Sequence, residues 1–242
     1  MLHGQATERQ DDSAHTNAMS AIEWDVSSPL GYNNRSGVYK TRVQFDFIRR
    51  LFPKPPARVL DVAGGCGRFA VPLLDAGYDV TVNDIHLPSL QLLQSRCSQR
   101  QPNILHGDFL KLGGLSEFDC VLAMECLDHM PFRVVLSRVH RVLKPGGVFV
   151  FTVLNAGSWR FALRRLAGRA ASGEFVMRSH EYRDACERAQ FEVVDVRGLM
   201  WSPFTVISNS PLVPVCARLE SALRLYALER QSPWLLLGMR RS

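Results

Sequence analysis

Short runs of apolar residues alternate along the chain with longer stretches in which apolar residues recur every three or four positions. The apolar runs predict buried strands at 59–62, 79–84, 103–106, 118–123, 148–153, 191–196 and 234–240. The longer stretches predict helices at 39–52, 69–75, 88–97, 132–143 and 180–190. Strands joined by such long crossovers run parallel. We therefore expect an α/β fold whose seven-stranded sheet is mostly parallel, with helices on both faces and the last strand antiparallel.

The same pattern divides the chain into three parts. Residues 1–20 are polar and lack periodicity, so we expect a mobile N-terminal tail there. Residues 21–56 place aromatic side chains in a loop-like stretch before the first helix, which is typical of a cover over a site. The remainder, 57–242, is predicted to be the α/β domain, with a basic insertion at about 155–180 that breaks the strand and helix rhythm.

A glycine turn follows the first predicted strand of the α/β domain. The strand enters Gly64-Gly65-Cys66-Gly67, and a predicted helix begins directly afterwards. Glycine lets the backbone approach a ligand closely, and the start of a helix offers free N–H groups. Residues 65–70 also satisfy the G-x-G-x-x-G/A pattern of dinucleotide sites. The turn alone therefore predicts a nucleotide-like ligand without choosing NAD over another one, and a plain tight turn is the alternative.

Acidic residues lie within or just beyond the first three strands of this domain. Asp61 precedes the glycine turn, Asp84 and Ile85 end the second strand, and Asp108 and Phe109 follow the third. A carboxylate at the second position can accept hydrogen bonds from both hydroxyls of a ribose, and an acid followed by an aromatic suits an adenine. Each acid alone also suits a structural role, in an Asx-turn, a helix cap or a pinned loop. Together they predict a nucleoside pocket at one edge of the sheet.

The fourth strand ends in a segment with candidate catalytic residues. If Met124 to Met130 forms a helical turn, then Glu125, Asp128 and His129 share one face. These three side chains could bind a divalent metal such as Mg²⁺, which would lower the pKa of an acceptor hydroxyl. Alternatively, His129 acts alone as the general base. In a third interpretation the two acids face solvent and the histidine caps the turn. The sequence leaves all three open.

Composition and charge restrict the class of protein. The chain has 242 residues, of which 46% are hydrophobic and 21% charged, as expected for a globular protein with a sizeable core. Its six cysteines contain no Cys-x-x-Cys pair, which indicates a reduced, cytoplasmic protein without structural zinc. We find neither a signal peptide nor an apolar run long enough to cross a bilayer. The net charge of +6 is typical of surface solubility and leaves contact with a membrane surface open.

Several motifs, taken in order, resemble the class I S-adenosylmethionine-dependent methyltransferases over roughly residues 40–200. These motifs are Leu60-Asp-Val-Ala-Gly-Gly-Cys-Gly67, Val80-Thr-Val-Asn-Asp84, Gly107-Asp108, Phe118-Asp-Cys-Val121 and Leu143-Lys-Pro-Gly-Gly147. Within that class, three further segments are similar to the ubiquinone-biosynthesis O-methyltransferases, which methylate catechol-type hydroxyls: Met124-Glu-Cys-Leu-Asp-His-Met-Pro131, Thr152-Val-Leu-Asn155 and Ser158-Trp159. The resemblance implies a Rossmann-like fold and S-adenosylmethionine as the cofactor.

The resemblance also implies roles for individual residues. It places the methionine moiety of the cofactor over Gly65 and Gly67, the ribose and adenine on the strand-end acids, and Met124 in the pocket wall. A basic residue of the first helix, Arg42 or Lys40, would reach the cofactor carboxylate. For nucleic acid methylation we would expect an Asn/Asp-Pro-Pro-Tyr/Phe motif after the fourth strand, and this chain has none.

We therefore expect O-methylation of a small aromatic, apolar or lipid-linked hydroxyl, with a small molecule as the partner. Aromatic residues of the insertion and the C-terminal segment, such as Trp159, Phe161, Trp201 and Phe204, are predicted to form the acceptor pocket. The alternatives are an NAD-dependent oxidoreductase and a non-catalytic module that binds S-adenosylmethionine. The second alternative is suggested by Ala63, where the family usually has its first glycine, and by an unmatched C-terminal segment.

Overall fold

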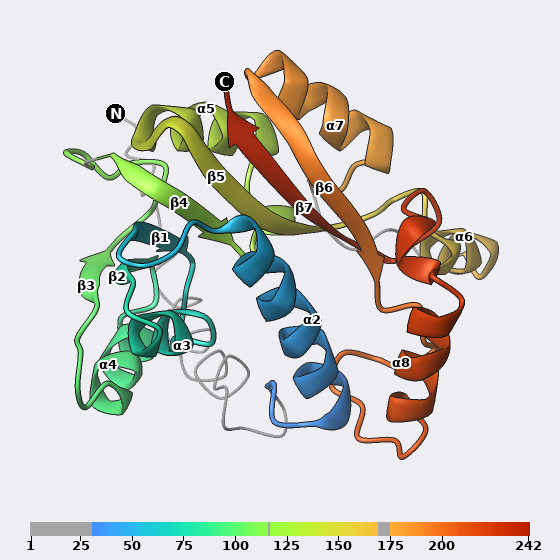
Figure 1. The fold of residues 1–242 in the computed structure, drawn as a ribbon. Coiled ribbons are helices and arrows are strands. Elements are labelled where there is room, and N and C mark those ends of the chain that lie inside the picture. Colours follow the sequence, from blue (N-terminus) through green and yellow to red (C-terminus); the bar gives the residue numbers. More distant parts are fainter. Residues whose placement is uncertain (1–30, 116, 169–174) are drawn as a thin grey trace, which may run out of the picture.

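A computed structural model describes residues 31–115, 117–168 and 175–242 (Figure 1). In this part of the chain one sheet runs in the order β3-β2-β1-β4-β5-β7-β6. Strands β1 to β5 pair in parallel, and β7 is antiparallel to both β5 and β6. The predicted fold class is therefore confirmed. The seven strands are β1 (Arg58–Val62), β2 (Asp79–Asp84), β3 (Asn103–His106), β4 (Phe118–Ala123), β5 (Leu143–Leu154), β6 (Phe191–Leu199) and β7 (Trp234–Arg241).

Helices cover both faces of the sheet. Side chains of α5 and α7 pack on one face, and those of α2, α3 and α4 pack on the other (Figure 1). Helices α6 and α8 lie at the end of the sheet formed by β5, β6 and β7 (Figure 1). The described helices are α2 (Arg35–Leu51), α3 (Ala70–Asp75), α4 (Leu87–Arg96), α5 (Phe132–Val142), α6 (Trp159–Leu166), α7 (Ser179–Arg188) and α8 (Val213–Ala222), with 3₁₀ turns η1 (Leu127–His129) and η2 (Leu225–Ala227).

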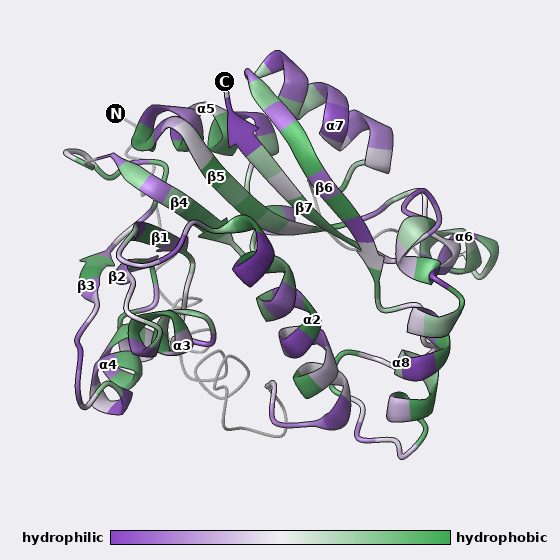
Figure 2. Cartoon of the chain, in the orientation of Figure 1, coloured by the Kyte–Doolittle hydropathy of each residue, from purple (hydrophilic) through white to green (hydrophobic). Residues whose placement is uncertain are grey.

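The pleat of the central strands explains why their sequences are apolar at nearly every position. In β4, Val121 and Ala123 join the cluster beneath α5, while Cys120 and Leu122 join the cluster beneath α2. All four side chains are fully buried. Figure 2 accordingly shows the central strands as mostly hydrophobic. Both faces of the sheet therefore lie in the core, as parallel sheets require.

Helix α2 begins four residues earlier than the apolar pattern predicts. The side chain of Asn34 accepts a hydrogen bond from the Gly37 N–H at 2.8 Å, which caps the helix and sets its start. Its buried face carries Lys40 and Gln44 as well as apolar residues. The predicted tail at 1–20 and the first part of the predicted cover lie outside the described residues.

The strand order fixes where a ligand can bind. β1 lies between β2 and β4: the chain runs from β1 to β2 and β3 on one side and then returns to β4 on the other side, so the strand order reverses at β1. Such a reversal opens a crevice beyond the carboxyl ends of the strands. The glycine turn follows β1 directly, so it lies at this crevice.

Candidate active site

A cavity of about 810 Å³ opens at the carboxyl ends of β1, β2, β3 and β4. It is closed on one side by Tyr32, which belongs to the predicted cover. The structure brings seven of the nine predicted cofactor residues together around this cavity, and the exceptions are Gly67 and Arg42. The seven are Asp61, Gly65, Asp84, Ile85, Asp108, Phe109 and Met124.

The glycines of the turn serve different purposes. Gly65 has a φ of +52°, and a β-carbon there would meet nothing closer than Asp84 Oδ2 at 3.8 Å, so the backbone is open to the cavity. Gly67 has a φ of +86°, but a β-carbon there would overlap Leu93 of α4. Gly65 therefore admits a ligand, while Gly67 allows α4 to pack closely. Ala63 also adopts a left-handed conformation, with a φ of 54°, where glycine would be unstrained.

Asp84 is held in position by the glycine turn itself. Its Oδ2 accepts a hydrogen bond from the Gly65 N–H at 2.8 Å, and its Oδ1 accepts one from the His86 N–H at 2.8 Å. Each carboxylate oxygen can accept a second hydrogen bond. Asp84 can therefore close its local turn and also bind two ribose hydroxyls.

Asp61 is the clearest indication of a missing ligand group. Its carboxylate is buried beneath Gly64, and its Oδ2 has no hydrogen-bond partner among the described residues. Burial raises the pKa of Asp61 to about 7, with the charge of Asp84 adding to the rise and that of Arg68 opposing it. A buried oxygen beside a cavity and without a donor fits a cationic or N–H group of a ligand. The amino group of an amino-acid cofactor would satisfy it.

A third strand end shapes the inner part of the cavity. The side-chain amide of Asn83 donates to the carbonyls of Leu105 and Gly107, both at 2.8 Å, and so fixes the turn after β3. This turn presents Asp108 and the buried ring of Phe109 to the cavity. An acceptor oxygen beside an apolar ring suits an adenine base, as the sequence predicts.

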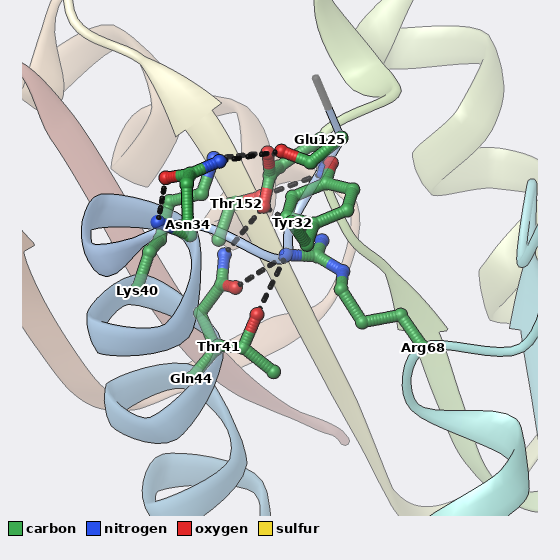
Figure 3. A network of polar contacts seen from close by, with 10 residues as sticks. Tyr32, Asn34, Lys40, Thr41, Gln44, Arg68, Glu125 and Thr152 are labelled. Carbon is green, nitrogen blue, oxygen red and sulfur yellow. Dashed lines mark hydrogen bonds and ion pairs between the residues drawn. The ribbon is translucent and has the colours of Figure 1, made fainter. Parts of the chain in front are cut away.

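A buried polar network closes the side of the cavity next to α2 (Figure 3). Glu125, at the end of β4, is at its centre. Its Oε1 accepts hydrogen bonds from Arg68 at 2.6 Å and Gln44 at 3.1 Å, and its Oε2 accepts them from Lys40 and from the Tyr32 hydroxyl at 3.1 Å. The network joins the cover, the glycine turn, α2 and β4.

The two cations keep Glu125 ionised. Burial alone would raise the pKa of its carboxyl, but the charges of Arg68 and Lys40 outweigh burial and hold this pKa well below its usual range. Both carboxylate oxygens are already occupied by donors. Glu125 is therefore an anchor for two buried cations, and this role differs from the predicted catalytic one because such a carboxylate is a poor proton acceptor.

The predicted metal triad is not assembled. The 3₁₀ turn Leu127–His129 starts two residues after Glu125, whose φ of 63° lies outside any helix, so the three side chains do not share a helical face. His129 Nε2 lies 3.6 Å from Asp128 Oδ2, and its side chain is 71% exposed. Residues 31–115, 117–168 and 175–242 contain no group of three His, Cys, Asp or Glu that could hold a metal ion. The residues present therefore do not fit a divalent metal.

The cation at the cavity is Arg68, which reasoning from the sequence missed. Arg42 is exposed and lines two other hollows instead, and Lys40 is buried with its amine on Glu125. The guanidinium of Arg68 lies 3.8 Å from the centre of the Tyr32 ring. Its position directly after Gly67 is a signal of proximity to the site, but nothing in the sequence tells which way the side chain points.

The insertion and the C-terminal segment pack on each other and leave the cavity to other residues. Arg160 donates hydrogen bonds to the carbonyls of Ser202 and Phe204. Asn155 donates from its side chain to three carbonyls between Glu229 and Ser232. None of the aromatic residues predicted to form the acceptor pocket lines the cavity.

The comparisons with known proteins agree with this geometry. A family model described as a methyltransferase domain matches residues 37–196, which is well over half of the chain. The chain therefore belongs to this methyltransferase family. The predicted resemblance to class I S-adenosylmethionine-dependent methyltransferases is thus confirmed, over nearly the same residues that carry it in the sequence.

Particular relatives narrow the class. The ubiquinone biosynthesis O-methyltransferase of Paracidovorax citrulli is 29% identical over 179 residues, which cover 67% of this chain and 75% of the relative. The enzyme of the same name from Methylobacterium nodulans is 24% identical over 215 residues, covering 80% and 86%. The crystal structure of magnesium protoporphyrin IX methyltransferase from Synechocystis with bound SAH is similar in fold, with a TM-score of 0.65, 16% identity and 96% coverage of both chains. The [4+2]-cyclase SpnF has a TM-score of 0.64 at 17% identity, covering 94% of this chain and 93% of SpnF.

Proposed function

We propose that this protein transfers a methyl group from S-adenosylmethionine to the hydroxyl of a small aromatic, apolar or lipid-linked molecule. The observation that carries the proposal is the buried carboxylate of Asp61, whose Oδ2 has no hydrogen-bond partner among the described residues and which lies in one cavity with Asp84 and Asp108. These acids match the amino group, the ribose and the adenine of that cofactor in order. The names of the relatives support a hydroxyl as the methyl acceptor.

In this proposal each residue binds a different part of the cofactor. Asp61 pairs with the amino group, Arg68 with the carboxylate, and Asp84 with the ribose hydroxyls. When bound, the cofactor supplies a methyl group activated by its sulfonium. The protein contributes mainly by holding this donor and the acceptor in line inside a cavity that excludes water.

His129 is the proposed general base. A hydroxyl acceptor has to lose its proton, and His129 lines the same cavity near Met130 and Pro131. The carboxylate of the neighbouring Asp128, whose Oδ2 lies 3.6 Å from His129 Nε2, can orient the imidazole. We derive no step through a divalent metal, because the side chains predicted to hold one are not grouped around a common point.

Isothermal titration calorimetry tests which cofactor binds, and so distinguishes the methyltransferase from the NAD-dependent oxidoreductase. We expect the full chain to bind S-adenosylmethionine and S-adenosylhomocysteine, but not NAD. Binding of NAD alone would overturn the proposal in favour of an oxidoreductase.

Transfer of a labelled methyl group to a panel of catechols and phenols tests the reaction. The fold is shared with a cyclase, so cofactor binding without turnover would favour a different chemistry or a non-catalytic module. We expect His129→Asn to lower kcat about 10²-fold or more while cofactor affinity stays within about twofold. Equal turnover of this variant and the parent would exclude His129 as the base.

The proposed partner is a small molecule, and the proposed location is the cytoplasm. All six cysteines are free thiols, as a reducing compartment would maintain them. No helix in the described ranges is long and apolar enough to cross a bilayer.

A further inference from the structure

A second hollow, of about 720 Å³, lies between helices α2 and α8. The two helices are side by side (Figure 1). Among the described residues, this hollow shares no lining residue with the cavity at the glycine turn. Its lining residues recur at helical spacing on each helix, so one side of α2 faces one side of α8 across it. They include Arg35, Val38 and Arg42 on α2, and Pro214, Arg218 and Ser221 on α8.

The charges that line this hollow are positive and uncompensated. Arg35, Arg42 and Arg218 are all exposed, and none of them has an ion-pair partner in the part of the chain that the structure describes. Segments 31–45 and 201–228 contain one acidic residue, Glu220, which is buried and accepts a hydrogen bond from the Trp201 N–H at 3.3 Å. A concave surface lined by charges of one sign attracts counter-ions. The hollow therefore favours an anionic ligand.

The start of α2 borders the hollow, but its first N–H groups are already occupied. The Arg35 N–H donates to the side chain of Asn209 at 3.3 Å. The Ser36 N–H donates to the Ser208 carbonyl at 3.0 Å. The next N–H is the one that Asn34 caps. These bonds attach the segment before α8 to α2 and so fix the rim, and the arginine side chains are the charged donors that remain for a ligand.

The spacing of the arginines indicates the size of the anion. Arg35 and Arg42 lie two turns apart on α2, which is roughly 10 Å along the helix axis, and Arg218 lies on the facing helix. A guanidinium binds a phosphate through two parallel hydrogen bonds. A single phosphate is too small to meet three such groups at this spacing. Linked phosphates carry more charge and spread it over a comparable length.

We propose that the hollow between α2 and α8 binds a soluble molecule that carries two or more linked phosphates, which pair with Arg35, Arg42 and Arg218. The bound ligand joins α2 to the C-terminal segment and stabilises the folded chain by mass action. This site does not depend on the proposed methyl transfer, because the hollow is separate from the cofactor cavity.

Titration calorimetry of the full chain with tripolyphosphate tests the site. We expect equal binding with and without excess S-adenosylhomocysteine, a higher unfolding temperature in the presence of tripolyphosphate, and weaker binding at high salt. Citrate should bind more weakly, since a carboxylate carries less charge than a phosphate. Arg35→Gln with Arg218→Gln should weaken tripolyphosphate binding about tenfold or more, because two charge-assisted contacts are lost.

A matched control is available on α5, where Arg133 and Arg141 are also exposed. Arg133→Gln with Arg141→Gln removes the same net charge and should leave binding unchanged. An equal loss in this control would overturn the proposal, because net charge alone would then attract the anion.

Three further results would also overturn it. They are the absence of tripolyphosphate binding by the parent, tighter binding of citrate, and binding of phosphatidylglycerol vesicles without binding of tripolyphosphate, since the ligand would then be a lipid headgroup. A parent that binds tripolyphosphate but methylates no phenol or catechol would count against the proposed function alone.

Discussion

Asp61 shows how a single residue can reveal an absent ligand. The carboxylate lies in the core, where an unpaired charge is costly, yet no group among the described residues donates a hydrogen bond to its Oδ2. A residue selected only for stability would be apolar here, as its neighbours in β1 are. The free-energy cost of burying this carboxylate is offset if a cationic ligand group in the cavity donates a hydrogen bond to it.

The first prediction concerns Asp61→Asn. The pKa of Asp61 rises from 3.8 to about 7 on folding, so the folded state holds this proton more tightly than the unfolded state. The free energy of unfolding should therefore fall as pH rises through this interval and level off above it, by a total on the order of 4 kcal/mol. Asp61→Asn should remove this slope and unfold at a higher temperature at pH 8. Thermal unfolding measured across the interval checks it.

The same variant should bind the cofactor poorly. Loss of a charge-assisted pair with the amino group should weaken S-adenosylmethionine binding at pH 8 at least tenfold, on the order of 1.5–3 kcal/mol. Titration calorimetry measures it. A variant that is more stable and yet binds equally well would show that Asp61 does not contact the ligand.

Some site residues are predictable because the fold alone determines where they lie. Asp84 and Asp108 follow strands, and the carboxyl ends of parallel strands meet at one edge. Arg68 and Glu125 are different, since they bind each other across 57 residues of sequence and the directions of their side chains depend on packing. Lys40 and Gln44 share the buried face of α2 with Phe47 and Ile48. Polar residues on that face are a signal of a buried polar network. The helix register places Lys40, and not Arg42, on the buried face.

At the scale of the element, two glycines of the glycine turn have different roles, and substitution by alanine can distinguish them. Gly67→Ala should be strongly destabilising, by about 2 kcal/mol or more, because the new methyl overlaps Leu93 and the backbone is left-handed. Gly65→Ala meets no atom closer than 3.8 Å, so it should cost only about 1 kcal/mol for its backbone conformation. Urea unfolding compares the two variants.

Cofactor binding should show the opposite order. The methyl of Gly65→Ala projects toward Asp84 and the cavity, so affinity should fall although the fold is kept. Whatever fraction of Gly67→Ala remains folded should bind the cofactor with nearly the parent affinity. If both variants lost stability and affinity in proportion, the two glycines would share one structural role.

The buried network makes a prediction about how β4 is joined to α2. Glu125→Gln leaves Lys40 and Arg68 buried with one anion fewer, so the free energy of unfolding should fall by about 3–5 kcal/mol. Lys40→Met in the same chain should recover part of this loss, because one uncompensated cation is removed. A double-mutant cycle by urea unfolding measures the coupling. Additive effects would show that the Lys40 and Glu125 pair adds no stability to the contact.

The topology of the sheet can be predicted from the sequence, whereas the residues that form the acceptor pocket cannot. Seven apolar runs separated by crossovers leave few topologies, and the parallel sheet follows from connection lengths. The C-terminal segment has weak periodicity, and its contacts are long-range: Asn155 reaches carbonyls 74–77 residues away. The aromatic residues there were predicted to form a pocket from their type alone. In the structure their segments pack on each other, which composition cannot reveal.

At the scale of the molecule, helix α2 contacts two other parts of the chain through polar side chains. Its Lys40 pairs with Glu125 after β4, and its Tyr39 binds α8. The Tyr39 hydroxyl donates to Glu220, which is buried on α8 with the charge of Arg160 nearby. Burial raises the pKa of Glu220 from 4.5 to about 7, and its hydrogen bonds and Arg160 only partly oppose the rise. The contact between α2 and α8 should therefore weaken as pH rises through this interval.

Glu220→Gln tests this coupling. Because the folded state holds the proton of Glu220 more tightly, stability is lost as pH rises from 4.5 to about 7 and levels off above that, with a total loss of up to the order of 3 kcal/mol at pH 8. The glutamine variant keeps an acceptor for Tyr39 and carries no charge, so it should lose this part of the pH dependence and equal or exceed the parent in stability at pH 8. Thermal unfolding of both proteins from pH 5 to pH 8 measures the difference. A variant that is less stable than the parent at pH 8 would mean that the ionised Glu220 stabilises the contact, and that its pair with Arg160 outweighs the cost of burial.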